Sequence, residues 1–181
     1  MKQLLSLFIL LLSSSAFTAD NPSVVMDTSK GKIIIELYPQ QAPKTVANFL
    51  AYIQQDGFRQ TTFHRVINNF MIQGGGFTAA GERADVFAAI DNESKNGLSN
   101  RRGSIAMART NHPHSATRQF FINQSNNTFL DGQSHKWGYT VFGQVTSGMQ
   151  VVDDIATIKT DRSDKPLQAI SINSITVQKI R

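Results

Sequence analysis

The sequence predicts a single antiparallel β-rich domain, either a sandwich or a barrel, with two helices far apart in the chain. Short apolar runs with strand-like alternation recur along the chain, whereas only two segments have helical spacing. No stretch has the composition of a linker or a low-complexity region. A length of 181 residues with 40% hydrophobic content suits one buried core.

The first predicted unit is a β-hairpin. Residues 24–26 and 32–37 are rich in Val and Ile, and they flank a polar segment that ends in Gly31. Pro39 ends the second strand because proline cannot donate to a sheet ladder.

A helix is predicted to begin at Pro43, since proline is favoured in the first turn of a helix. Gly57 is the predicted stop signal. The apolar face of this helix has spacings of three and four and consists of Val46, Phe49, Leu50 and Ile53.

Six strands and one more helix are predicted in the remainder. The strands cover residues 63–67, 70–73, 104–108, 119–122, 141–145 and 170–177, and the helix covers 149–155. Three glycines, Gly74 to Gly76, follow the second of these strands and lack the Lys-Ser/Thr of a phosphate-binding loop. They predict a tight turn.

The segment Phe63–Phe77 places one arginine among large apolar residues. With strand alternation, Arg65 shares a face with Phe63 and Ile67. A cation on such a face needs a partner, because its desolvation alone is costly. Arg65 is therefore either a snorkelling barrel residue or a donor aimed into an apolar groove, where it meets a carbonyl or an amide.

Several motifs in the same order resemble the cyclophilin family of peptidyl-prolyl cis-trans isomerases. The resemblance runs from about Val24 to the C-terminus and includes Phe63-His64-Arg65, residues 104–109, 119–123 and 129–132, and the run 141–145 with Gly148-Met149. It implies a closed eight-stranded barrel with a helix covering each end, and an enzyme that acts on X-Pro bonds without a cofactor.

The resemblance also implies a site. Arg65 matches the family's catalytic arginine and would donate to the twisted amide. The substrate-binding residues would be Phe70, Met71, Gln73, Ala108, Arg109, Gln119, Phe121, Phe129, Leu130 and Tyr139. The backbone of Ala108 and Arg109 would pair with an extended peptide, and the two glutamines would bond that peptide or orient the arginine.

Three positions depart from the common family pattern. Phe129 stands where animal members mostly have tryptophan, Tyr139 stands where histidine is usual, and Asn68-Asn69 replaces Pro-Gly. Trp137 lies nearby, in an insertion, and is not assigned the role of the missing indole. The first two departures are typical of the exported bacterial subgroup, and the loss of the indole donor predicts weak cyclosporin binding.

The N-terminus has the pattern of a signal peptide. Lys2 precedes an apolar run over residues 4–12 and a small-residue stretch over 13–19, so cleavage is expected after Ala16 or Ala19. The apolar run is about half of the roughly 20 residues that a membrane anchor needs. We therefore expect residues 1–19 to be removed, and residues 20–181 to form the exported domain, periplasmic in a Gram-negative host and not inserted in the membrane.

Composition argues against other classes of function. The net charge of +5 is modest and no nucleic-acid module surrounds the arginines at 101, 102, 109 and 118. The four histidines lack zinc-site spacing, and the chain has no cysteine. The resemblance implies that the partners are proline-containing unfolded or extended polypeptides, bound by a monomer. The alternative is a proline-peptide-binding module or chaperone with incidental isomerase activity, against which Arg65 argues because binding alone needs no donor at the proline nitrogen.

Overall fold

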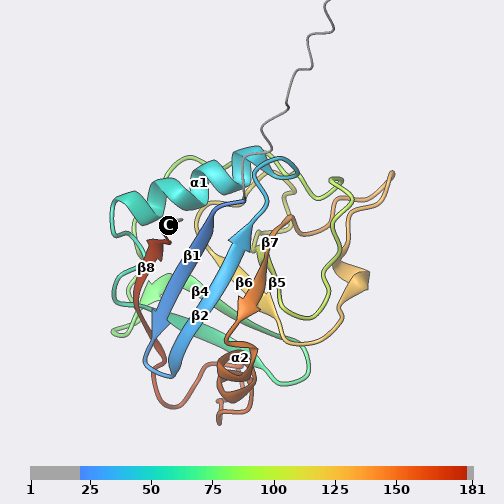
Figure 1. The fold of residues 1–181 in the computed structure, drawn as a ribbon. Coiled ribbons are helices and arrows are strands. Elements are labelled where there is room, and N and C mark those ends of the chain that lie inside the picture. The colour runs from blue at the N-terminus through green and yellow to red at the C-terminus, as the bar shows by residue number, and fades with distance from the viewer. Residues whose placement is uncertain (1–20, 179–181) are drawn as a thin grey trace, which may run out of the picture.

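The computed structural model describes residues 21–178, and Figure 1 shows their fold. The predicted signal peptide and its cleavage sites lie outside the described residues. Among residues 21–178, no helix is long and apolar enough to cross a membrane.

Eight strands within residues 21–178 form a closed barrel in which every neighbouring pair is antiparallel. The strands are β1 (Ser23–Thr28), β2 (Gly31–Leu37), β3 (Thr61–Ile67), β4 (Met71–Thr78), β5 (Ser104–Met107), β6 (Phe120–Asn123), β7 (Val141–Ser147) and β8 (Ser171–Val177). Their order around the barrel is β1-β2-β7-β5-β6-β4-β3-β8. The barrel confirms the architecture that the family resemblance implied.

Two helices, α1 (Pro43–Gln54) and α2 (Met149–Ala156), lie at opposite ends of the barrel (Figure 1). The helix α1 begins at the predicted proline, and its buried face includes Val46 and Phe49. Phe49 packs against the rings of Phe58, Phe120 and Phe142 with centroid distances of 5.0–5.7 Å. These contacts join α1 to the barrel core.

The predicted stop at Gly57 is wrong in detail. The helix ends at Gln54, and the residue that takes the left-handed conformation is Asp56, with φ of 52°. Aspartate tolerates this region better than most residues, because its short polar side chain bonds locally. The chain therefore turns one residue earlier than the glycine.

The predicted tight turn at Gly74–Gly76 is also wrong, because all three glycines lie within β4. They are needed for close approach of the core. A Cβ on Gly74 would lie 2.9 Å from the ring of Phe63, and one on Gly75 would lie 2.9 Å from the ring of Phe120. Gly74 and Gly75 thus let aromatic rings pack against the backbone of the barrel wall, and Gly76 leaves space for the side chain of Gln119.

A bulge in β3 changes the predicted faces of that strand. Phe63 pairs with Gly74 and Arg65 pairs with Gln73, so one strand advances two residues while the other advances one. Phe63 and Val66 consequently both belong to the barrel core. The prediction that Arg65 shares a face with Phe63 is wrong, since the bulge turns Arg65 away from the core.

Candidate active site

A cavity of about 270 Å³ lies on the outer face of the barrel. It is bounded by strands β3, β4 and β6, by the segment after β5, and by the 3-10 helix η1 (Thr128–Leu130). Its nine lining residues are Arg65, Phe70, Met71, Gln73, Ala108, Arg109, Phe121, Leu130 and Tyr139. All nine are among the residues that the sequence predicts for the site.

The floor of the cavity is an apolar cluster separate from the barrel core. Met71 and Phe121 are buried in it, and Phe70, Leu130 and Tyr139 pack against it while partly exposed. The rings of Phe121 and Tyr139 meet edge to face with centroids 5.6 Å apart. This surface suits a small apolar ring such as that of proline.

Arg65 stands at the edge of this apolar floor. Its side chain is 44% exposed, and its Nε lies 3.4 Å from Oδ2 of Asp164. The guanidinium is therefore held beside the cavity rather than buried in it. An arginine in this place offers several N–H donors in a planar array.

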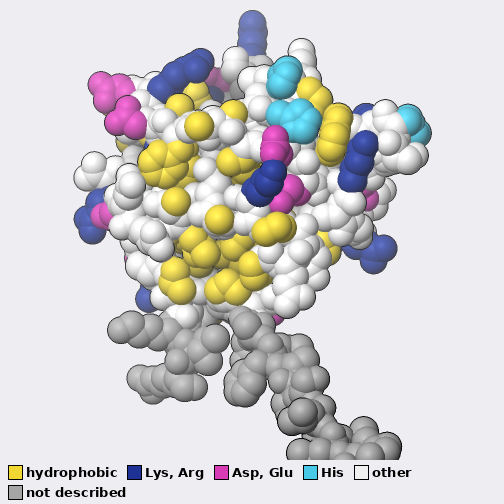
Figure 2. Space-filling model, turned by 90° about the horizontal axis from the view of Figure 1, so that it is seen from above, with side chains coloured by type: hydrophobic (Ala, Val, Ile, Leu, Met, Phe, Trp, Pro, Cys, Tyr) yellow, Lys and Arg dark blue, Asp and Glu magenta, His cyan; other side chains and the backbone are white. Residues whose placement is uncertain are grey.

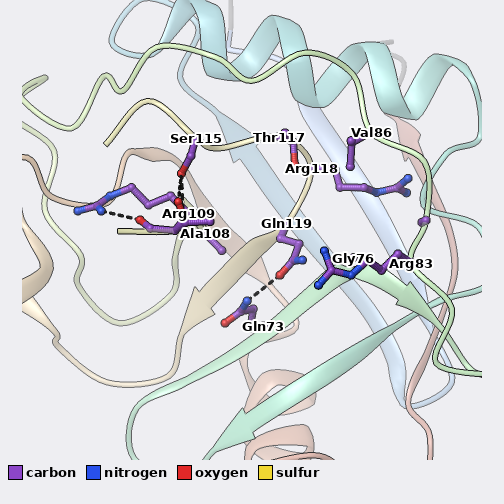
Figure 3. Close-up of a pocket in the computed structure, with 12 residues that line it drawn as sticks. Gln73, Gly76, Arg83, Val86, Ala108, Arg109, Ser115, Thr117, Arg118 and Gln119 are labelled. Carbon is purple, nitrogen blue, oxygen red and sulfur yellow. Dashed lines mark hydrogen bonds between the residues drawn. The ribbon is translucent and has the colours of Figure 1, made fainter. Parts of the chain in front are cut away.

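The two predicted glutamines bond each other. Nε2 of Gln73 donates to Oε1 of Gln119 at 2.9 Å, which links β4 to the residue before β6. Figure 3 shows this bond beside a second cavity, which Gln119 lines together with Arg83 and Thr117. Gln73 and the segment Ala108-Arg109 line both cavities, so the two adjoin.

Part of the predicted backbone pairing is already taken up. The amide of Ala108 donates to the carbonyl of Gln119 at 2.9 Å, so this N–H is not open to a peptide. The Arg109 guanidinium donates to the carbonyls of Thr110, Trp137 and Gly138. It also lies 4.6 Å from the ring centre of Tyr139, which fixes the wall on that side.

Phe129 lies at the rim and does not line the cavity. Its ring stacks on that of Phe70 with centroids 5.9 Å apart, and the residue is 65% exposed. Trp137 packs elsewhere, between the ring of His114 and the ammonium of Lys95. This placement agrees with leaving Trp137 out of the predicted site.

The family follows from comparison with known proteins. The model of the family described as cyclophilin type peptidyl-prolyl cis-trans isomerase/CLD matches residues 23–177. The chain belongs to the cyclophilins. Isomerisation of peptidyl-prolyl bonds is therefore its activity.

Relatives of this cyclophilin match over most of the chain. The peptidyl-prolyl cis-trans isomerase cyp18 of Streptomyces antibioticus is 50% identical, covering 86% of this chain and 98% of its own. Isomerase B of Escherichia coli K12 is 48% identical over 85% of this chain and 98% of its own. A crystal structure of a Cryptosporidium parvum cyclophilin in the presence of the dipeptide Ala-Pro has a TM-score of 0.75 at 30% identity, covering 87% and 99% of the two chains.

Two other sets of residues in this cyclophilin are the possible metal ligands and the clustered arginines. Within residues 21–178, no group of three or more metal-ligating side chains comes together. Of the clustered arginines, Arg102 pairs with Asp153, and buried Arg118 donates to backbone carbonyls. Positive and negative side chains are interspersed on the face in Figure 2.

Sequence reasoning missed three residues close to the site. Arg83 and Thr117 line the second cavity, and Asp164 pairs with Arg65. None of them stands in a motif that signals function, because each reaches the site through a loop packed there by the tertiary fold.

Proposed function

We propose that Arg65 is the catalytic donor of this isomerase. The observation that carries the proposal is its position at the edge of an apolar floor formed by residues such as Met71 and Phe121. A proline ring on that floor would bring its amide bond within reach of the guanidinium.

The chemistry needs no nucleophile or metal. Rotation about an X-Pro bond faces a barrier of about 18–20 kcal/mol, because the amide C–N bond has partial double-bond character. In the twisted state the nitrogen lone pair is no longer delocalised and accepts a hydrogen bond. A donor placed there stabilises the twisted state more than the planar one, and about 6 kcal/mol gives roughly 10⁴-fold acceleration.

The test is an Arg65→Ala variant in an assay that couples X-Pro isomerisation to a conformer-specific protease. Loss of a hydrogen bond to a charged donor costs about 1.5–3 kcal/mol, so turnover should fall roughly 10- to 150-fold while peptide affinity changes little. Phe121→Ala, the comparison variant, should weaken binding because it removes a wall of the cavity. Turnover of Arg65→Ala within about twofold of the wild type (~0.4 kcal/mol) would refute the role of Arg65.

The same two variants test a chaperone or peptide-binding role when protection of unfolded clients is measured. A protein selected for binding alone would keep its protection of unfolded clients in the Arg65→Ala variant and lose it in Phe121→Ala. Wild-type exchange rates should be unaffected by a chelator, since the proposed chemistry uses only protein donors.

We further propose that this cyclophilin belongs to the exported bacterial subgroup and assists the folding of exported proteins as a monomer. The supporting observations are the signal-like residues 1–19 and the family match, which begins only at residue 23. The N-terminus of the native protein should lie between residues 17 and 20, and the protein should fractionate with the periplasm of a Gram-negative host. A cytoplasmic protein that retains Met1 would overturn the proposal, and light scattering tests the monomer.

A further inference from the structure

Asp164 is the carboxylate that faces Arg65. Its Oδ2 lies 3.4 Å from Nε of the arginine, and the two side chains are 42% and 44% exposed. Within residues 21–178 this is the one ion pair that Arg65 makes. The contact leaves the two terminal nitrogens of the guanidinium outside the pair.

The loop that carries Asp164 is held by its own hydrogen bonds. Oδ1 of Asp161 accepts from the amides of Ser163 at 2.8 Å and Lys165 at 3.0 Å. The amide of Asp161 donates to the carbonyl of Lys165 at 2.8 Å. Residues 161–165 therefore form a closed turn whose shape does not depend on the side chain of Asp164.

This turn is also fixed to the strand that bears Arg65. The amide of Val66 donates to the carbonyl of Asp164 at 2.8 Å. The backbone of Asp164 thus lies against β3 one residue beyond the arginine. The carboxylate and the guanidinium are consequently presented to each other by two segments that are already joined.

Asp164 also has a left-handed backbone, with φ of 63°. Glycine adopts this conformation without cost, and aspartate tolerates it better than most residues. The position therefore admits a glycine, an asparagine or an aspartate, and it holds the carboxylate that contacts Arg65.

We propose that Asp164 is a positioning residue for Arg65. This inference rests on the proposed catalytic role of that arginine. The carboxylate binds Nε and restricts the rotamers of a long, mobile side chain, so that the terminal N–H groups are directed at the peptide nitrogen before substrate arrives. Ordering the arginine in advance removes an entropic cost that would otherwise fall on the twisted state.

The primary variant is Asp164→Asn, because asparagine tolerates the left-handed conformation and removes only the charge. Exposed ion pairs are weak, so kcat should fall about two- to fivefold at low ionic strength with KM nearly unchanged. At about 0.5 M salt the difference in kcat between Asp164→Asn and the wild type should become smaller, since the Debye length falls to roughly 4 Å. Asp154→Asn, which removes an exposed carboxylate on α2, is the charge-matched control and should behave as the wild type.

Two further variants separate positioning from loop structure. In an Arg65→Lys background, which lacks Nε–H, Asp164→Asn should have no additional effect on kcat. Asp164→Gly should lose as much kcat as Asp164→Asn does. Its melting temperature should stay within about 3 °C of the wild type, because glycine adopts the same φ.

The outcomes are distinguishable. An active wild type with unchanged kcat in Asp164→Asn at low salt would overturn the positioning role and leave the proposed function intact. A defect that persists at high salt and in the Arg65→Lys background would also overturn it, since the loop would then act structurally. An inactive wild type would overturn both proposals.

Discussion

Replacing Arg118 should test how the barrel wall beside the site is held together. This arginine is 4% exposed and lies next to Gln119 of the site. Its guanidinium donates to the carbonyls of Gly57, Gly75 and Asp85, which belong to three separate segments. It also lies 4.9 Å from the ring centre of Tyr52.

The magnitude follows from these contacts. Arg118→Met keeps an apolar stem but removes all three donors. The bond to Gly75 is buried, whereas the bonds to Gly57 and Asp85 are partly buried. A buried carbonyl left without a partner costs about 1–3 kcal/mol, and a partly buried one costs less. Relief of the desolvated cation offsets part of this loss, because burial disfavours the charge and lowers the pKa of Arg118. We expect a net loss of about 2–4 kcal/mol in the free energy of unfolding.

Thermal and urea unfolding measure this loss directly. For a domain of this size, about 2–4 kcal/mol corresponds to a melting temperature roughly 4–16 °C lower. The melting temperature of Arg118→Lys should lie between those of Arg118→Met and the wild type, since one ammonium cannot reach three separated carbonyls. Arg101→Met, at an exposed arginine, is the matched control. A melting temperature for Arg118→Met within about 2 °C of the control would refute the reasoning.

Three further predictions concern the site and its surroundings. A Cβ on Gly76 would lie 2.5 Å from Nε2 of Gln119, so Gly76→Ala should break the hydrogen bond between Gln119 and Gln73. We expect kcat/KM to fall roughly two- to twelvefold, which corresponds to about 0.5–1.5 kcal/mol. An unchanged kcat/KM would contradict this prediction. Burial lowers the pKa of His64 below its ordinary 6.5, so the stability that its neutral form provides is lost as pH falls from about 7 through the lowered pKa. The free energy of unfolding of His64→Gln should therefore vary less between pH 7 and 5 than that of the wild type. If the two proteins lost stability in parallel over this range, His64 would not be the source of the pH dependence. Phe129→Trp should bind cyclosporin about 5- to 150-fold more tightly than the wild type, which corresponds to one recovered hydrogen bond of ~1–3 kcal/mol. The isomerase rate should change little. Equal cyclosporin affinities would show that Phe129 does not occupy the position of the family's tryptophan.

Local chemistry determined much of this protein from its sequence. Proline at position 43 and the apolar spacing after it locate α1, and alternating Val and Ile runs locate β1 and β2. These signals depend on neighbours a few residues away, so they can be interpreted without the fold. Motif order gave the barrel and all nine lining residues of the cavity, because such motifs record a three-dimensional arrangement already associated with a family.

Tertiary structure decided the features that depend on a distant partner. A bulge, at which β3 advances two residues while β4 advances one, turns Arg65 away from the core. The glycines at 74 to 76 lie within β4, where a Cβ on Gly74 or Gly75 would meet an aromatic ring and a Cβ on Gly76 would meet the side chain of Gln119. Asp164 meets Arg65 across 99 residues of sequence, and no local pattern specifies such a contact. Charge and periodicity are properties of a segment, whereas the partner that neutralises a charge or fills a space is set only when the barrel closes.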